Sequence, residues 1–316
     1  MMDCFVGFDT SNYTTSAAVC TLEGEVIANI KAPLPVKCGE CGLRQSDAVF
    51  AHVKNLPAVS DQLRDALLQK RVLAVGCSAR PRDSEGSYMP CFLSGVAAAR
   101  SFAAPLNVPV FDFSHQNGHV MAAVYSAGVK EGFLQKPFFA FHVSGGTTEV
   151  LHVTPTDNGF DVKLVANTED LNAGQAIDRI GVMMGLSFPC GKEIEALAKE
   201  NTQKIPRARV CVKNGNCNLS GLQNLAFRMF EETHDVRAVS AFTLSFIADT
   251  LCEMTRHLDR IDPTLPIVYA GGVMSNRYLQ ERLSLRKDTF FAEPAFSADN
   301  AAGIALLCRA RYLKGC

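Results

Sequence analysis

The chain has 316 residues, of which 47% are hydrophobic and 20% charged, and its formal net charge is −1. This length allows two compact lobes or one large α/β domain, and the composition is ordinary for a globular enzyme. The balanced charge excludes a global electrostatic footprint for nucleic acid, so RNA binding would need a local basic patch. The segment Lys204–Lys213 is the best candidate for such a patch, although a run of this kind is more often a solvated edge.

The first elements predicted along the chain are strands and helices in alternation. A Glu23-Gly24 pair between two of the strands suits a hairpin turn. Pro57 is expected to interrupt the first helix. The predicted strands cover residues 4–9, 16–22, 26–30, 72–76 and 108–111, and the predicted helices cover residues 47–70 and 91–104.

The same pattern restarts after Pro137, which suggests a duplicated α/β fold whose two halves flank a cleft. In the second half, residues 144–146 form the turn of the hairpin. Strands are predicted at 138–143, 147–153, 161–165 and 266–270, and helices at 222–232, 237–260, from near Ser275, and at 298–313.

Twelve cysteines are present, and several, such as Cys77 and Cys308, lie in apolar runs where a free thiol acts as a small hydrophobe. The N-terminal residues do not resemble a signal peptide, and no segment is apolar for long enough to span a membrane. We therefore expect a cytoplasmic protein with no membrane partner. Cys38 and Cys41 form a single CxxC pair, for which two free thiols or a redox or metal role are the alternatives.

His115 and His119 are four residues apart at the start of a predicted helix, so both can face one cation. A pair at this spacing is also common among surface and capping residues. The residues between the histidines include no acid, which excludes the general base of an HExxH metalloprotease.

Two glycine-rich segments follow buried strands and could hold a phosphate. In the first, Ser144-Gly145-Gly146-Thr147, glycines with positive φ would let amide groups approach an anion, and an ordinary hairpin turn is the alternative. In the second, Gly271-Gly272 leads a strand into a helix start, where Asn276 could bind ligand or simply cap the helix.

Two carboxylates lie near predicted helix starts. Asp299 could be a helix N-cap or a ligand. Asp178 could bind a ribose hydroxyl, or it could pair with a base such as Arg179.

Taken together and in this order, these segments resemble the TsaD family, whose members make threonylcarbamoyl-adenosine in tRNA and were once called O-sialoglycoprotein endopeptidases. The resemblance covers nearly the whole chain. It rests on seven segments: His115–His119, Val143–Gly146, Gly174–Asp178, Gly185–Gly191, Leu219–Leu222, Gly271–Asn276 and Ser297–Ala302.

The resemblance implies an actin-like ATPase fold of the sugar-kinase and heat-shock-protein type, with two RNase H-like lobes around a nucleotide cleft. We expect residues 1–114, completed by the C-terminal helix 298–316, to form the first lobe and residues 115–297 to form the second.

The resemblance also implies the ligands and the site residues. His115, His119 and Asp299 would bind Fe²⁺ or Zn²⁺, and Asp9 and Ser144 are the candidate catalytic residues. An adenine nucleotide, ATP, AMP or a carbamoyl-type adenylate, would be bound, with Mg²⁺ as an additional candidate ion. Its expected contacts are Ser144, Gly145, Gly146, Thr147, Asp178, Gly191, Gly271, Gly272 and Asn276.

The chain departs from the family pattern at several positions. The acidic pair that usually follows the first strand is replaced by Tyr13 and Thr14. Ser114 stands where a further histidine is common, Asn117 where glutamate is, and Cys190 where glycine is. The ligand set is thus retained, while residues on the acceptor side have changed.

Two functions follow. In the first, a metal-dependent acyltransferase transfers a threonylcarbamoyl or carbamoyl group from an adenylate to the amine of adenosine in tRNA. The alternative is a divergent paralogue that binds nucleotide and metal, either as a partner subunit or for carbamoyl transfer to another acceptor. A homodimer or a paralogous subunit would then be the protein partner.

Overall fold

The computed structural model describes residues 1–11, 13–35, 43–129 and 132–315. The chain divides into two compact units. Unit 1 comprises Met1–Ser126, Thr154–Val162 and Ala295–Cys316, and unit 2 comprises Ala127–Val153 and Lys163–Pro294. No helix in the described part of the chain is long and apolar enough to cross a bilayer. The assignment of the two lobes to residues 1–114 and 115–297 stays a prediction.

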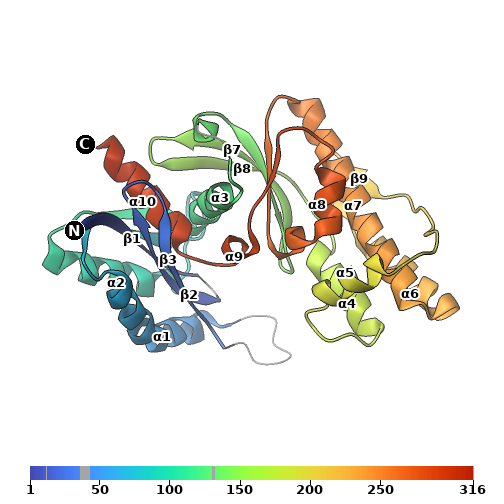
Figure 1. Ribbon diagram of the computed structural model, residues 1–316, viewed down its shortest axis with the longest axis horizontal. Coiled ribbons are helices and arrows are strands. Elements are labelled where there is room, and N and C mark those ends of the chain that lie inside the picture. The colour runs from blue at the N-terminus through green and yellow to red at the C-terminus, as the bar shows by residue number, and fades with distance from the viewer. Residues whose placement is uncertain (12, 36–42, 130–131, 316) are drawn as a thin grey trace. The chain divides into compact units, whose positions relative to one another are not determined.

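Unit 1 is built on a five-stranded sheet in the order β3-β2-β1-β4-β5 (Figure 1). The first three strands form an antiparallel meander, and β4 and β5 continue the sheet in parallel with β1. Gly24, with φ of 93°, makes the predicted turn between β2 and β3. The strands are β1 (Met2–Thr10), β2 (Thr14–Thr21), β3 (Val26–Pro33), β4 (Lys70–Arg80) and β5 (Val110–Ser114).

Helices cover both faces of this sheet because side chains alternate along each strand. Val6, Phe8 and Val75 pack with residues of α1 (Gln45–Ala66) and α2 (Phe92–Ala103). The opposite face is in contact with α10 (Ala302–Lys314), which runs so close that a Cβ at Gly7 would lie 2.5 Å from the amide nitrogen of Ala305. Helix α10 also packs against α3 (His115–Ser126).

Unit 2 contains the second sheet, in the order β12-β11-β6-β7-β8. Strand β6 pairs antiparallel with β7 and parallel with β11, and β11 pairs parallel with β12. Read from the β8 edge, this is the strand order of the first sheet, so the predicted duplication is confirmed. The strands are β6 (Phe138–Val143), β7 (Thr148–Thr156), β8 (Gly159–Asn167), β11 (Ile267–Ala270) and β12 (Thr289–Phe291).

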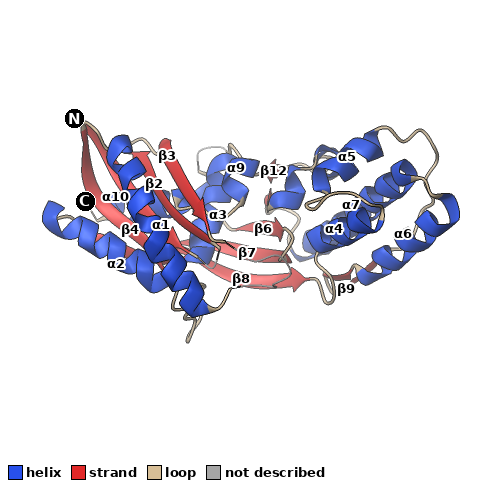
Figure 2. Cartoon of the chain, turned by 90° about the horizontal axis from the view of Figure 1, so that it is seen from below, coloured by secondary structure: helices blue, strands red, loops and turns tan. Residues whose placement is uncertain are grey.

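The helices of unit 2 pack together beside this sheet (Figure 2). The longest is α7 (Val236–Ile261), whose buried face includes Phe242, Leu251 and Leu258 in the core of the unit. On the sheet, the rings of Phe141 and Tyr269 stack with centroids 4.5 Å apart. The other helices are α4 (Ala173–Met183), α5 (Gly191–Lys199), α6 (Ser220–Thr233) and α8 (Arg277–Leu283), with short 3-10 turns at Phe133–Gln135 and Gly272–Ser275.

Three expectations about local structure were wrong. Helix α1 continues through Pro57, which is exposed together with Val53, so the carbonyl group that loses its helical partner can bond to water. The last helix begins at Ala302 rather than at 298, because Asn300 accepts the amide proton of Ala302 at 3.0 Å. A small hairpin, β9 (Cys211–Lys213) and β10 (Asn216–Asn218), was not predicted.

Candidate functional site

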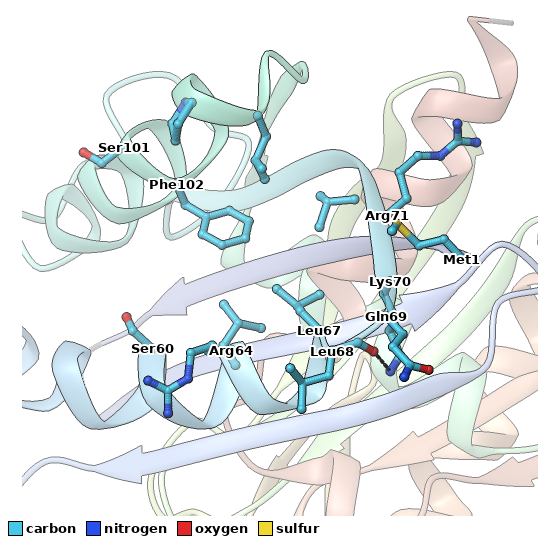
Figure 3. A pocket seen from close by; sticks show the side chains of 14 residues that line it. Met1, Ser60, Arg64, Leu67, Leu68, Gln69, Lys70, Arg71, Ser101 and Phe102 are labelled. Carbon is cyan, nitrogen blue, oxygen red and sulfur yellow. Dashed lines mark hydrogen bonds between the residues drawn. The ribbon is translucent and has the colours of Figure 1, made fainter.

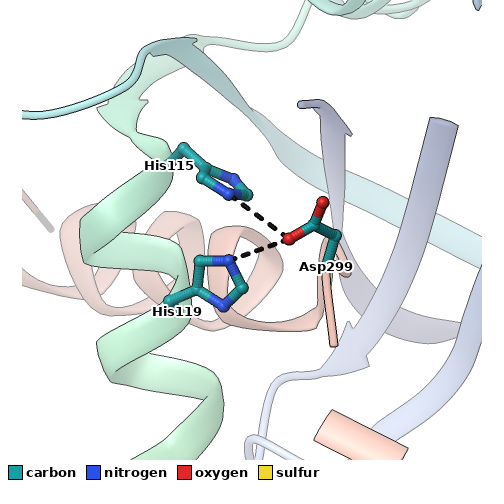
Figure 4. Close-up of side chains that lie close together, drawn as sticks. All are labelled: His115, His119 and Asp299. Carbon is teal, nitrogen blue, oxygen red and sulfur yellow. Dashed lines mark hydrogen bonds and ion pairs between the residues drawn. The ribbon is translucent and has the colours of Figure 1, made fainter. Parts of the chain in front are cut away.

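The two histidines lie on one face of α3, as their spacing predicts. His115 is the first residue of this helix and follows β5 directly, so the sheet fixes its position. The rings of His115 and His119 approach edge to face with centroids 4.3 Å apart (Figure 4).

Asp299 faces both rings. Its Oδ1 lies 3.1 Å from Nε2 of His119 and 3.6 Å from Nε2 of His115. Its Oδ2 accepts a hydrogen bond from the Ser11 hydroxyl at 2.7 Å. Asp299 does not cap α10, whose N-cap is Ala301, and its carboxylate is directed toward the histidines (Figure 4).

Asp9 orients His115 from the other side. Its side chain is fully buried at the end of β1, and its Oδ1 accepts hydrogen bonds from Nδ1 of His115 at 2.9 Å and from the Ser78 hydroxyl. An ionised carboxylate only accepts, so Nδ1 of His115 carries the proton and Nε2 can bind a cation. The Oδ2 atom of Asp9 is buried without a hydrogen-bond partner among the described residues.

The carboxylates determine the protonation of His115 in the metal-free protein. Burial by itself lowers the pKa of this imidazole, but the charge of Asp9 and the hydrogen bonds from Asp299 and Asp9 outweigh it and raise the pKa to about 10. Burial likewise raises the pKa of Asp299, yet the two histidines hold it well below its usual range. Near neutral pH the His115 ring therefore carries a proton on Nε2 as well as on Nδ1, and a cation bound at Nε2 would replace that proton.

The geometry fits a small divalent cation. One ligand atom from each of His115, His119 and Asp299 lies within 4.8 Å of the others, and this is the only such group of three or more within the ranges described. With metal–ligand bonds of about 2.1 Å, two ligand atoms of a tetrahedral site are about 3.4 Å apart. The 3.1 and 3.6 Å separations at Asp299 are close to that value. A ligating histidine usually donates its other ring N–H to a carboxylate, as His115 does to Asp9 here.

Three residues that support the site were missed from the sequence: Ser78, which donates to Asp9, and Ser11 and His52. Ser11 binds Asp299, and its carbonyl oxygen accepts a hydrogen bond from Nε2 of His52 at 2.8 Å. Nδ1 of His52 then accepts the Thr15 hydroxyl proton at 2.8 Å. His52 is fully buried in α1, and burial lowers its pKa. No motif marks these residues, because their contacts join segments far apart in the chain.

The altered positions lie around this group. Tyr13 is 45% exposed, whereas Thr14 is buried at the start of β2. Ser114, at the end of β5, and Asn117, on α3, both donate to Asp83, and the Asn117 amide also bonds to the backbone of Phe160 in both directions. An acid from the loop after β4 thus lies beside the two substituted positions of the histidine motif.

The predicted nucleotide residues lie in unit 2, at the carboxyl ends of its parallel strands, where open α/β sheets bind ligands. The turn after β6 is closed by the Ser144 hydroxyl, which accepts the amide protons of Gly146 and Thr147 at 3.3 and 3.1 Å. The expected positive φ was wrong for Gly145 and Gly146. Glycine is required nearby instead, since a Cβ at Gly174 would lie 2.7 Å from the Ser144 carbonyl oxygen.

The second glycine segment follows β11, the neighbour of β6. Gly271 has φ of 101°, and a Cβ there would lie 2.2 Å from the carbonyl oxygen of Val143, so no other residue fits. Gly272, by contrast, faces open space. Asn276 caps α8 by accepting the amide proton of Leu279 at 3.2 Å, which is the capping role left open in the sequence.

Asp178 lies on α4 and holds the loop before α5. Its Oδ1 accepts the amide proton of Cys190 at 2.8 Å, immediately before Gly191, whose Cα faces open space. Arg179 binds Gln223 rather than Asp178. The Ser144 turn therefore lies next to both Gly271 and the start of α4, at one edge of unit 2.

A hollow of about 860 Å³ in unit 1 lies at the amino-terminal ends of β1 and β4, away from the end of β1 that carries Asp9 (Figure 3). Its lining includes Leu67, Val72 and Phe102. The cations at its edge have partners: Arg71 binds Asp3 at 2.7 Å, Arg64 binds Asp61 at 3.4 Å, and Lys70 donates to the Leu68 carbonyl oxygen at 3.4 Å. The hollow lacks converging polar groups, so we assign it no chemistry.

The nine cysteines in the described ranges are free, and burial raises the pKa of most of them, for example that of Cys91 to about 11. Such thiols are packing residues rather than nucleophiles. Cys38 and Cys41 lie outside the described residues.

Comparison with solved structures defines the class of fold. HypF of T. kodakarensis is similar with a TM-score of 0.61 at 12% identity, over 99% of this chain and 48% of HypF. Component A of (R)-2-hydroxyglutaryl-CoA dehydratase from Acidaminococcus fermentans has a TM-score of 0.56 at 14% identity, over 98% and 99% of the two chains. The fold is the expected α/β fold of actin-like ATPases and sugar kinases.

Comparison of sequences defines the family. The family described as TsaD, tRNA N6-adenosine threonylcarbamoyltransferase, matches residues 42–306. The protein of that name from Streptococcus mutans is 30% identical over 327 residues, which cover 100% of this chain and 94% of the relative. That from Streptococcus sanguinis is 31% identical over 290 residues, which cover 88% and 82%. The chain belongs to the TsaD family.

Proposed function

We propose that this protein transfers a threonylcarbamoyl group from an adenylate to the amine of an adenosine in tRNA. Membership of the TsaD family over nearly the whole chain supports the reaction. The single structural observation that carries the proposal is the group formed by His115, His119 and Asp299, with Asp9 oriented behind it.

In this proposal, the group holds one Fe²⁺ or Zn²⁺ ion through Nε2 of both histidines and a carboxylate oxygen of Asp299. Three protein ligands leave coordination positions open, as in catalytic metal sites. A cation bound there supplies a Lewis acid for a carbamoyl or phosphate oxygen. Asp9, predicted from the sequence as a catalytic residue, acts in this proposal as a positioning residue that fixes the tautomer and ring orientation of His115.

The adenylate would bind in unit 2. The turn formed by Gly145, Gly146 and Thr147 would meet its phosphate through the amide of Gly145, since the Ser144 hydroxyl already accepts the amide protons of Gly146 and Thr147. Asp178 can accept a hydrogen bond from a ribose hydroxyl. The Ser144 hydroxyl, which accepts two amide protons, can donate its own proton to a phosphate oxygen. Gly191, Gly271, Gly272 and Asn276 complete the proposed contacts.

The transfer itself balances without an oxidant or reductant. The amine nitrogen attacks the carbamoyl carbon, the bond from that carbon to the phosphate oxygen breaks, and AMP leaves with the electron pair. The amine loses one proton. The negative charge that develops on the carbonyl oxygen is stabilised by preorganised positive groups in sites of this kind.

The experiment that tests the proposal supplies the purified protein with threonylcarbamoyl adenylate and unmodified tRNA, and measures threonylcarbamoyl-adenosine by nucleoside mass spectrometry. We expect product from the wild type and a loss of at least about 100-fold with the His115→Ala/His119→Ala double variant. No product from wild-type protein that binds the adenylate would contradict the proposal.

That negative result would favour the second candidate, a paralogue that binds nucleotide and metal without catalysis, alone or with a paralogous subunit. The observation in its favour is the replacement of the acidic pair by Tyr13 and Thr14, of which Thr14 is buried and Tyr13 exposed. Restoring the acids with Tyr13→Asp/Thr14→Glu would then be the informative variant.

A further inference from the structure

One face of the segment between α5 and β10 carries a row of basic side chains. Residues 207 to 213 alternate between exposed and partly buried positions, as in an extended strand. Ala208, Val210 and Val212 pack against the core of unit 2. Arg207, Arg209 and Lys213 project outward on the other face, with the exposed thiol of Cys211 between the last two. We call Arg207, Arg209 and Lys213 the basic row.

The charged side chains of the basic row are unpaired within the described part of the chain. None of its three side chains makes a hydrogen bond or an ion pair with any residue that the structure describes. Three exposed cations elsewhere in unit 2 are paired: Lys199 lies 2.9 Å from Glu195, Arg237 lies 2.8 Å from Glu200, and Arg256 lies 2.6 Å from Glu253.

The Lys213 end of the row lies on a small hairpin. Strand β9 pairs with β10 through the two-residue turn Asn214-Gly215, whose φ values of 53° and 87° suit a type I′ hairpin. The turn packs on α7, since a Cβ at Gly215 would lie 2.6 Å from the His257 ring. The hairpin holds Lys213 in place, and the packing of Ala208 and Val210 on the core holds the backbone beside Arg207 and Arg209, which lowers the entropic cost of a contact.

We propose that the basic row is a contact surface for the phosphate backbone of RNA. The inference rests on the proposed function, which makes tRNA the acceptor, and it names the residues of unit 2 that hold that acceptor. With a rise of about 3.3 Å per residue, the row spans about 20 Å, enough to meet several successive phosphates of a strand. Exposed arginine and lysine side chains with free N–H donors bind phosphate groups without reading the base sequence.

A membrane surface fits the row less well. Proteins that bind anionic bilayers through cations also place apolar side chains beside them for insertion. The large hydrophobic side chains exposed in the described chain include none between Phe188 and Leu225. The basic row therefore has no large apolar side chain near it in the sequence that could insert into a bilayer.

The test compares tRNA binding by the full-length protein and by the variant Arg207→Ala/Arg209→Ala/Lys213→Ala, at several salt concentrations. The matched control is Lys199→Ala/Arg237→Ala/Arg256→Ala, which removes the same charge from the same unit but only from paired positions. Each phosphate contact contributes roughly 0.7 to 0.9 to the slope of log K against log salt. We expect a slope lower by about 2 and a roughly 10-fold or greater loss of affinity in the row variant only.

Alkylation of Cys211 gives a second readout that needs no variant. Bound tRNA should slow modification of this exposed thiol, measured by peptide mass spectrometry, while Cys252 serves as the internal reference. Protection of Cys211 together with the lower salt slope would support the proposal.

Two results would overturn it in distinguishable ways. If the wild type binds tRNA and the row variant binds with the same affinity and salt slope, the row is not the contact, and the proposed function stands. If the folded wild type binds anionic phospholipid vesicles through the row but not tRNA, both the RNA contact and the tRNA acceptor are wrong.

Discussion

Nδ1 of His115 donates a hydrogen bond of 2.9 Å to the buried carboxylate of Asp9, and this bond leaves Nε2 of the same ring facing Asp299. Asp9 ends the first strand and His115 begins the helix after the fifth, so the parallel pairing of β1, β4 and β5 brings them together. The hydrogen bond to Asp9 fixes the orientation of the His115 ring, one of the expected metal ligands, before any cation binds.

The first prediction concerns this bond. Asp9→Asn should weaken metal affinity by about 10- to 100-fold, because the carboxylate that accepts from Nδ1 of His115 fixes this ring and raises the basicity of Nε2. Competition with a chromogenic chelator measures the affinity. Asp3→Asn on the same strand, whose carboxylate binds only Arg71 at the surface, is the control and should leave the affinity unchanged. Equal affinities in all three proteins would show that Asp9 does not position His115.

The second prediction concerns His52 and pH. Burial lowers its folded-state pKa below the unfolded value of about 6.5, so folding favours the neutral ring. This contribution is complete above about pH 6.5 and is lost as the pH falls from there toward the folded pKa, with a slope of up to about 1.4 kcal/mol per pH unit. Urea unfolding at pH 7.5 and 5.5 measures it. His52→Gln should reduce the difference between the two pH values, and an unchanged difference would exclude His52 as its source.

How much of the site the sequence predicts depends on sequence separation. The four-residue spacing of His115 and His119 predicts a shared helix face, and the structure has it. Asp299 is 180 residues from His119 and Ser11 is 288 residues from Asp299. Such contacts follow from the order of strands in the sheet, which local patterns do not encode. Asp299 could therefore be named only through the family resemblance, and Ser11, Ser78 and His52 could not be named at all.

The fold was more predictable than the site. The same order of strands and helices occurs twice in the chain, and the hydrophobic runs that form the strands are clearly separated by polar turns. The β9–β10 hairpin was missed although Asn214-Gly215 is a strong turn signal, since its strands are only three residues long. The predicted break at Pro57 failed because helix packing through Val59 and Leu63 outweighs one lost hydrogen bond at the surface.

The third prediction separates two adjacent glycines. Gly271→Ala should destabilise the fold by at least about 1–3 kcal/mol, because φ of 101° is strained for alanine and the new Cβ collides with Val143. Gly272→Ala, with open space at the same point, should change stability by less than about 1 kcal/mol. Thermal unfolding compares them. Equal losses of stability would mean that the backbone at Gly271 is not as described.

The fourth prediction concerns the nucleotide. Asp178→Asn keeps an oxygen for the amide of Cys190 but removes the charge, so the loop should stay in place while adenine-nucleotide affinity falls by about 10-fold, the effect of one lost charge-assisted hydrogen bond. Calorimetry with AMP measures the affinity, and Glu281→Gln on α8 is the control. Unchanged affinity in Asp178→Asn would remove Asp178 from the proposed contacts.

The central claim is that His115, His119 and Asp299 form a metal site. Elemental analysis of protein purified without chelators tests it most directly. We predict about one equivalent of iron or zinc per chain in the wild type, as expected for a site with three protein ligands, and almost none in a folded His115→Ala/His119→Ala variant. A wild type without bound metal after incubation with either ion, or a double variant that retains one equivalent, would contradict the account.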